Sequence, residues 1–580
     1  MKFVDLSTLE ITTELDVLKR DTQRNSFFLY QHKGIFFADN SRIGNQNQQE
    51  AEQKYINVIK KAKQDNISLL LTPEYSCPKS VVDKIINEID LQPSDNKVWV
   101  LSGESLNKVE LQNLKSLEHD NLYIHFEDVY TYSDKNYVDP LYYIFRGKYK
   151  GVSKLIIIIQ FKTHHMGVWT GGDVERDNLI EGNNIYIIKN NNNSVRLLSF
   201  ICSEAMNVNS YLTDEKKDEY YWNDMPFLIL HPQINPDPSH NDFIDFRKGI
   251  LKSNKKEVVS LNWGRETYVR GNNWYENRGN TPRSGIFFKT REINQSEAYI
   301  GNNHKKGLYF LKINRDKFVY YLNGDIDLIH FNNTSVDIVD GVPAQQRREG
   351  PIVSNIYKFD NSLNFEKIET INDNHISFLS SRGVTNLYLL NVHKSVINKE
   401  RLLNISMGNV VGKEGKNWAE IINLNSFNLR ESDECNNRLT YIEDTYESSQ
   451  VVRRDTCTNI IELDLNILPH SKYYPHSIKY LESKNISLAF SENADFFGYR
   501  YNVVNSFGEI EKATICYIGN SDFRLAKKTY SELQKLFDSD STGGNTVVVF
   551  YKQGNDILNI SNIDAGSITQ TSINPTSITD

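Results

Sequence analysis

Short apolar segments alternate with amphipathic ones between residues 34 and 103, and this pattern restricts the chain to a small set of folds. The apolar segments have the length of β-strands, and the amphipathic ones repeat apolar residues at helical spacing. Strands are expected at 34–38, 67–71 and 98–101, and helices at 51–62 and 81–89. Strands that are apolar throughout and separated by helices are typical of a sheet covered on both faces. The pattern therefore predicts an α/β fold.

Further apolar segments continue this pattern to about residue 313. Strands are expected at 155–161, 185–188, 195–201, 227–231, 258–262, 285–289 and 307–313, with a helix at 242–252. We expect the later strands to lie in the same layer as the first ones. In α/β sheets, functional side chains collect just beyond the carboxyl ends of the strands.

The chain has 580 residues, enough for about two to four domains. Residues 1–32 are charged, and we interpret them as a helical lead-in. The α/β domain is expected over 33–340. A polar, charge-mixed stretch at 340–350 is the predicted linker to the rest of the chain.

A second, mixed α/β domain is predicted over 351–564. It contains a strand–helix–strand unit, with strands at 513–518 and 546–551 and a helix at 521–537. Residues 565–580 are rich in Ser, Thr and Ile without periodicity, and we expect them to form a disordered tail.

Charge and hydropathy argue against some classes of partner. The formal net charge is −8, whereas binding to a phosphate backbone needs a clustered face of Lys and Arg, so the composition argues against nucleic acid. No segment approaches the ~20 apolar residues that span a bilayer. The N-terminus also lacks the apolar region of a signal peptide. We expect no membrane association.

The cysteines are few, odd in number and widely spaced, at Cys77, Cys202, Cys435, Cys457 and Cys516. This usage favours reduced thiols in a cytoplasmic protein over a disulfide framework. No Cys-X-X-Cys pair or Cys/His cluster indicates a zinc site.

Three chemically active residues each follow a predicted strand: Glu74, Lys162 and Cys202. Taken singly, each has an ordinary structural interpretation. Cys202 can be an inert core thiol, Glu74 a solvated loop acid, and Lys162 a strand-end lysine that reaches water. Taken together they are a nucleophile, a base and a cation, which are the groups that acyl transfer through a thiol requires.

The ordered set of local motifs resembles the nitrilase superfamily over residues 33–320 or so. The similar segments are LLLTPE ending at Glu74, QFKTHHM around Lys162, the run from Glu175 to Gly182, ICSE around Cys202, and SGIF beginning at Ser284. The resemblance implies an αββα sandwich domain in which Cys202 is the nucleophile, Glu74 the general base and Lys162 the oxyanion stabiliser. It further implies that the Ser203 amide assists Lys162, with Glu204 beside it in the oxyanion and substrate-binding segment.

The same resemblance implies a fourth functional acid that positions the lysine and substrate. Glu175 is preferred for this role over Glu181 because of its spacing to Gly182. Self-association into homo-oligomers is implied as well, and neither a cofactor nor a metal is expected. The chain departs from the family pattern at Ser203, where the family has an aromatic residue, and in the long acidic and Tyr-rich segment 104–154.

The predicted function is cysteine-dependent hydrolysis of a non-peptide carbon–nitrogen bond through an acyl-thioester. We expect an amide substrate before a nitrile. One alternative is an N-acyltransferase of the same fold, which passes the acyl group to an amine. Another is a non-catalytic nitrilase-like binding or assembly module within a multi-domain bacterial protein, for example one acting in defence.

Overall fold

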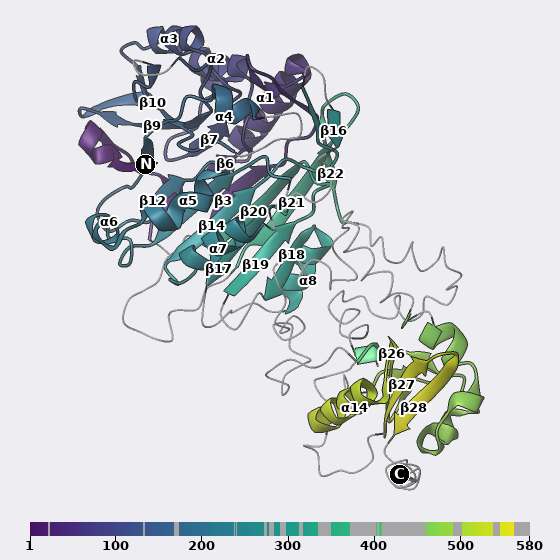
Figure 1. The fold of residues 1–580 in the computed structure, drawn as a ribbon. Coiled ribbons are helices and arrows are strands. Elements are labelled where there is room, and N and C mark those ends of the chain that lie inside the picture. The colour runs from purple at the N-terminus through teal and green to yellow at the C-terminus, as the bar shows by residue number, and fades with distance from the viewer. Residues whose placement is uncertain are drawn as a thin grey trace, which may run out of the picture. The chain divides into compact units, whose positions relative to one another are not determined.

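The computed structural model describes most of the chain (Figure 1). The described residues are 1–20, 24–130, 134–166, 173–236, 238, 240–271, 275–277, 283–289, 297–312, 317–334, 350–371, 402, 405–408, 459–460, 462–490, 501–537 and 546–561. The chain divides into two compact units, one of residues 1–310 with 316–371 and the other of residues 311–315 with 372–580.

The larger sheet of the first unit has ten strands. They are β2 (Ile11–Thr12), β3 (Arg24–Tyr30), β6 (Leu69–Leu71), β7 (Val98–Ser102), β8 (Leu122–His125), β9 (Pro140–Tyr149), β10 (Val152–Phe161), β20 (Leu328–Thr334), β21 (Ile352–Phe359) and β22 (Phe365–Ile368). The order is β22-β21-β20-β3-β6-β7-β9-β10-β8, and β2 pairs with β9. β3, β6 and β7 are parallel neighbours, whereas β9 runs antiparallel to β7 and β10.

Two amphipathic helices, α1 (Gln48–Gln64) and α2 (Lys79–Asn87), pack on one face of this sheet. Asn47 is the N-cap of α1, and its side chain accepts a hydrogen bond from the Glu50 amide at 3.2 Å and so satisfies an otherwise free helix N–H. The apolar stripes of both helices share one hydrophobic cluster with β6, β7 and β10. Full burial of each aliphatic side chain in such a cluster contributes about 1.5–3 kcal/mol. The third helix is α3 (Lys108–Ser116), and a capping box formed by Asn107 and Glu110 stabilises its N-terminus.

A second sheet of six strands has the order β12-β13-β14-β17-β19-β18. Its strands are β12 (Arg196–Ser199), β13 (Phe227–Pro232), β14 (Lys256–Leu261), β17 (Gly285–Lys289), β18 (Leu308–Lys312) and β19 (Lys317–Leu322). The remaining helices are α4 (Val174–Asn178), α5 (Glu204–Tyr211), α6 (Asp214–Glu219), α7 (Asn241–Ile250) and α8 (Glu297–Lys305). α7 packs over β13, because the Phe246 ring lies 5.3 Å from that of His231.

Side chains link the two sheets directly. Gln160 of β10 donates to the Ser199 carbonyl of β12 at 3.0 Å, and Asn333 of β20 donates to Glu257 of β14 at 2.7 Å. Helices lie on the outer faces (Figure 1). Smaller sheets pair β1 (Lys2–Asp5) with β11 (Asn184–Ile187), and join β4 (Ile35–Ala38), β5 (Ile43–Asn45), β15 (Tyr268–Arg270) and β16 (Tyr275–Asn277). The unit is a mixed α/β structure, as predicted.

The expected single layer is wrong. β12, β13 and β14 belong to the second sheet, and β11 pairs with β1. Strands of both large sheets, β6 and β7 in one and β12 and β13 in the other, are buried along their whole length, so their sequence patterns do not show to which sheet each belongs.

The expected helical lead-in over 1–32 is also wrong. This region contains β1, β2 and two short 3₁₀ turns, η1 (Leu6–Leu9) and η2 (Asp16–Leu18). It ends in β3, which lies inside the ten-stranded sheet between β6 and β20. The Phe27–Tyr30 end of β3 is fully buried, so its apolar content outweighs the charged residues before it.

The predicted boundary at 340 and the second-domain start at 351 differ from the structure. β21 pairs with β20, and β22 pairs with β21, so the first unit extends to residue 371. Residues 340–349 of the predicted linker lie outside the described residues.

The second unit contains the predicted strand–helix–strand as β26 (Ala513–Asn520), α14 (Phe523–Phe537) and β27 (Thr546–Gln553). β26 and β27 are parallel, and β28 (Asp556–Ser561) is antiparallel to β27. Asp522 caps α14 by accepting from the Leu525 amide at 2.8 Å. The unit also contains a π-helical turn, η6 (Leu463–Ile467), and two 3₁₀ turns, η7 (Ser471–Tyr473) and η8 (His476–Leu481). A small antiparallel sheet joins β23 (Ser487–Leu488), β24 (Val503–Val504) and β25 (Ile510–Glu511). The predicted tail, 565–580, lies outside the described residues.

None of the helices in the described part of the chain combines the length and hydrophobicity that a bilayer crossing requires.

Candidate active site

Four of the predicted site residues come from elements that meet between the two large sheets. Glu74 follows β6, Lys162 follows β10, Cys202 follows β12, and Glu175 lies in α4. All four side chains are buried. β6 and β10 belong to the ten-stranded sheet and β12 to the six-stranded sheet.

Lys162 is held by two acids. Its Nζ donates to Glu74 Oε1 at 2.7 Å and to Glu175 Oε1 at 2.6 Å. Burial alone would lower the pKa of Lys162, but the Glu175 and Glu74 carboxylates hold this pKa well above its ordinary value. The lysine is therefore a permanent cation at neutral pH.

Glu175, rather than its rival Glu181, belongs to this cluster. Its carboxylate accepts a hydrogen bond from the Tyr75 hydroxyl at 2.7 Å and another from the Met166 amide. Glu181 is exposed and accepts only from the His165 amide at 3.2 Å, among the contacts that the described residues make.

Glu74 is oriented by groups from other strands. Its Oε2 accepts from the Ile234 amide at 2.8 Å, and its backbone carbonyl accepts from Trp263 Nε1 at 2.7 Å. Burial raises the pKa of Glu74, against the opposing effect of Lys162. A buried carboxylate with a raised pKa is a suitable proton acceptor near neutral pH.

Cys202 lies at a sharp turn between β12 and α5 with a left-handed backbone, φ 40°. Its amide donates to the Pro232 carbonyl at 2.9 Å, and its carbonyl lies 3.1 Å from His231 Nε2. Burial raises the pKa of the thiol, and the nearby Glu74 carboxylate raises it further, whereas Lys162 opposes the shift. The thiol thus interacts with both groups, and ionisation needs a base beside it.

Ser203 and Glu204 brace the turn. Ser203 Oγ donates to the His164 carbonyl at 2.7 Å. The Glu204 carboxylate accepts from the amides of Thr163 and Ile201, each at 2.6 Å. These bonds tie the residue after Lys162 to the residue before Cys202. The substrate-binding role expected of Glu204 stays a prediction, because both of its oxygens are engaged by backbone.

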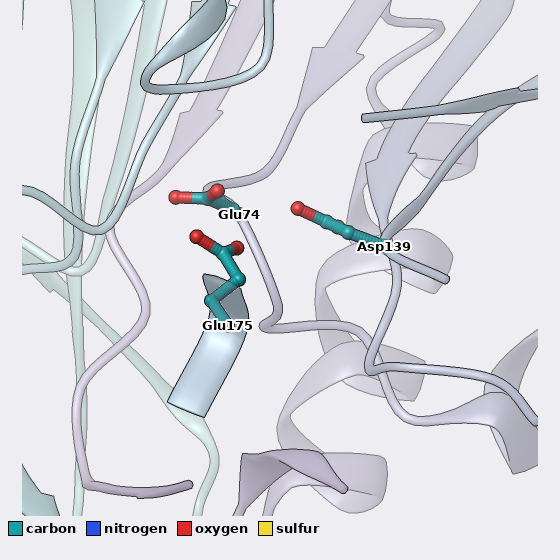
Figure 2. Close-up of side chains that lie close together, drawn as sticks. All are labelled: Glu74, Asp139 and Glu175. Carbon is teal, nitrogen blue, oxygen red and sulfur yellow. The ribbon is translucent and has the colours of Figure 1, made fainter. Parts of the chain in front are cut away.

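Asp139 is a fourth buried acid that the sequence did not reveal. It directly precedes Pro140 of β9, and its carbonyl accepts from the Lys162 amide at 3.0 Å. Figure 2 shows its carboxylate directed toward those of Glu74 and Glu175. Burial raises the pKa of Asp139 well above its usual range, and the Glu74 carboxylate raises it further. Asp139 is brought opposite Lys162 by the β9–β10 hairpin, whose register pairs Phe161 with Pro140.

Glu74, Asp139 and Glu175 together could also offer ligands to a metal. One carboxylate oxygen from each of Glu74, Asp139 and Glu175 lies within 4.8 Å of the others. Lys162 Nζ contacts two of the three, so it already supplies the positive charge that a cation would bring.

No protein-family model and no curated protein matches the sequence. Similar solved structures include an amidase from Nesterenkonia sp., described as a nitrilase-superfamily member, at 11% identity and a TM-score of 0.26, covering 46% of this chain and 83% of that one. A glutamine-dependent NAD⁺ synthetase from Acinetobacter baumannii matches at 10% identity and a TM-score of 0.26, covering 60% and 48%. A CN-hydrolase superfamily protein from Xanthomonas campestris matches at 10% identity and a TM-score of 0.25, covering 45% and 82%. Matches at these values do not assign an activity or a substrate to this chain.

Proposed function

We propose that this chain hydrolyses the carbon–nitrogen bond of a small amide, in preference to that of a nitrile, through a thioester on Cys202. The observation that carries the proposal is the buried Lys162 ammonium, held by Glu74 and Glu175 beside the Cys202 thiol. A nucleophile, a base and a fixed cation in one water-poor site are the groups that acyl transfer needs.

In the first step, the Cys202 thiol passes its proton to Glu74 while the sulfur attacks the amide carbon. The electron pair of the carbonyl bond moves to oxygen. Lys162 Nζ and the backbone N–H of Ser203 are the groups proposed to stabilise that oxyanion. Collapse of the intermediate breaks the carbon–nitrogen bond, and Glu74 returns the proton to the leaving amine.

In the second step, Glu74 takes a proton from water, and the resulting hydroxide attacks the thioester carbon. The carbon–sulfur bond then breaks, the thiolate recovers the proton from Glu74, and a carboxylic acid leaves. Glu175 holds Lys162 in place throughout. Its second oxygen is fixed by the Met166 amide, so the lysine is presented in one orientation.

The test is release of ammonia or amine from a panel of short aliphatic and aromatic amides and nitriles, using the full-length protein. Cys202→Ala is expected to reduce kcat by about 1,000-fold or more, because no other nucleophile replaces the thiol. The matched control is Cys77→Ala, which removes another buried thiol of the same unit. Turnover that survives in Cys202→Ala, or that falls equally in Cys77→Ala, would contradict the proposal.

Mass spectrometry of the protein quenched during turnover provides a second readout. An acyl adduct on Cys202 is expected, and it should be absent from Cys202→Ala. Added amines that divert the adduct into an N-acyl product would instead support the transferase alternative. Homo-oligomer formation and a cytoplasmic location remain predictions.

A further inference from the structure

Asp139 is a buried acid whose carboxyl group lies against that of Glu74 but accepts no hydrogen bond from an N–H or O–H group of the described residues. Its side chain is fully buried, and neither of its oxygens accepts a hydrogen bond from an N–H or O–H group within the described ranges. Even so, it lies within 4.8 Å of carboxylate oxygens of both Glu74 and Glu175 (Figure 2). An unpaired buried carboxylate costs far more free energy than a neutral carboxyl group at the same place.

The charges of the cluster do not balance when every acid is ionised. Glu74, Asp139 and Glu175 would carry three negative charges against the single positive charge of Lys162. Like charges this close in a low-dielectric interior cannot all persist, so one acid retains a proton.

Hydrogen bonding identifies which acid retains it. Glu74 accepts from Lys162 and from the Ile234 amide, so its ionised form is stabilised by two donors. Glu175 accepts from Lys162, from Tyr75 and from the Met166 amide. Asp139 has no such donor among the described residues. Donors favour the charged form of an acid, and their absence favours the neutral form.

We propose that Asp139 holds a proton in the resting site, directs it toward Glu74, and thereby positions that carboxylate as the base. This role rests on the proposed function, which makes Glu74 the base. The proton stays on Asp139 while Glu74 exchanges its own proton with Cys202, the leaving amine and water. Asp139 is thus a positioning residue rather than one that contacts the reacting atoms.

The other titratable groups that interact with Asp139 belong to several elements. They are Glu74 after β6, Lys162 after β10, Glu175 in α4, and the phenols of Tyr75 and Tyr137. Burial raises the pKa of both tyrosines, so each is neutral at neutral pH. Lys162 is the cation of this set, and it is already shared by Glu74 and Glu175.

The first experiment measures the proton directly, in the full-length protein and without substrate. Infrared spectroscopy of protein labelled with ¹³C-aspartate, at about pH 8 where ordinary carboxyls are ionised, should show the carbonyl stretch of an un-ionised carboxyl that shifts with the label. The band should vanish in Asp139→Asn and persist in Asp464→Asn. Asp464 is a useful control because burial raises its pKa only to about 6. Absence of the band from the wild type, or its survival in Asp139→Asn, overturns the proposal.

The second experiment reads the effect on the nucleophile. Alkylation of Cys202 is followed against pH by mass spectrometry in wild type, Asp139→Asn and Asp139→Leu. Ionisation of Asp139 adds a negative charge that opposes thiolate formation, so Asp139→Asn should move the alkaline part of the profile to lower pH by about one unit. Asp139→Leu removes the donor to Glu74 and should slow alkylation at neutral pH. A merely structural role would leave the profile of Asp139→Asn unchanged, and that result contradicts the proposal.

Failure of this inference can be distinguished from failure of the proposed function. The infrared band does not depend on turnover. A band assigned to Asp139 without amidase activity would retain the inference about the proton and reject the function. Amidase activity without the band would support the proposed function and reject the inference about the Asp139 proton. If Asp139→Asn fails to fold, absence of the labelled band from the wild type still overturns the proposal.

Discussion

Lys162 Nζ lies 2.7 Å from Glu74 Oε1, and neither side chain is in contact with solvent. Removal of two such charges from water is expensive, and a buried pair is therefore weak evidence for stability on its own. The second acid, Glu175, and the amide donors around it offset part of that cost. The presence of this charged cluster in the core is more simply explained by a role in a reaction than by a contribution to folding stability.

The free energy of unfolding should respond strongly to loss of the lysine. Lys162→Met leaves Glu74 and Glu175 without their shared cation, and we expect a loss of about 3–5 kcal/mol. The measurement is urea unfolding followed by circular dichroism. The control is Lys79→Met, which breaks the partly exposed Lys79–Asp83 pair on α2 and should cost about 0.5 kcal/mol or less. Equal effects of the two substitutions would contradict this account of the site.

The left-handed backbone of Cys202 predicts an inverted order of stability between alanine and glycine. At most positions glycine is less stable than alanine, whereas at φ 40° the Cβ of alanine is strained. The free energy of unfolding of Cys202→Gly, measured in urea, should therefore be about 1 kcal/mol higher than that of Cys202→Ala. At Cys77, which is equally buried but is not among the described residues with positive φ, alanine should be the more stable. The same order at both positions would show that the turn is unstrained.

The strand ends that carry Glu74, Lys162 and Cys202 could be predicted because each follows an apolar run of strand length. Their division between two sheets could not. β6, β12 and the second half of β10 are buried on both faces, so periodicity does not tell one layer from another. β3 was missed for a related reason, since only its last four residues are apolar and charged residues precede them.

Asp139 could not be predicted because its importance depends on a pairing and not on a motif. The register of β9 with β10 places Phe161 opposite Pro140, and this brings Asp139 beside Lys162. The Tyr-rich sequence of β9 carries no strand signal as clear as that of β10. Motif spacing favoured Glu175 over Glu181, and the contacts of Glu175 with Lys162 and Tyr75 give that preference a physical basis, while its functional role stays a prediction.

Glu204 should make the first unit less stable as pH rises. Burial raises its pKa from 4.5 to about 7, although the Ile201 and Thr163 amides oppose the shift. The folded state therefore keeps a proton that the unfolded state has already lost, and the free energy of unfolding falls by about 3 kcal/mol between about pH 4.5 and 7. Urea unfolding of wild type and Glu204→Gln across this range should give curves that differ by this slope. The exposed Glu181→Gln is the control, and it should follow the wild type; parallel curves for Glu204→Gln would refute the assignment.

His231 should make the first unit less stable as pH falls, which is the opposite of the effect of Glu204. Burial lowers its pKa from 6.5 to about 3, against a hydrogen bond with the Cys202 carbonyl, so the folded protein cannot take up the proton that the unfolded chain gains. Stability is lost as pH falls from about 6.5 toward 3, by about 4–5 kcal/mol at the limit. His231→Gln can still donate to Cys202 and accept from Ser260, without a titrating group. Its free energy of unfolding, measured in urea, should fall less steeply than that of the wild type below about pH 6.5. The exposed His240→Gln should match the wild type, and a His231→Gln curve parallel to both would mean that His231 is protonated in the folded protein.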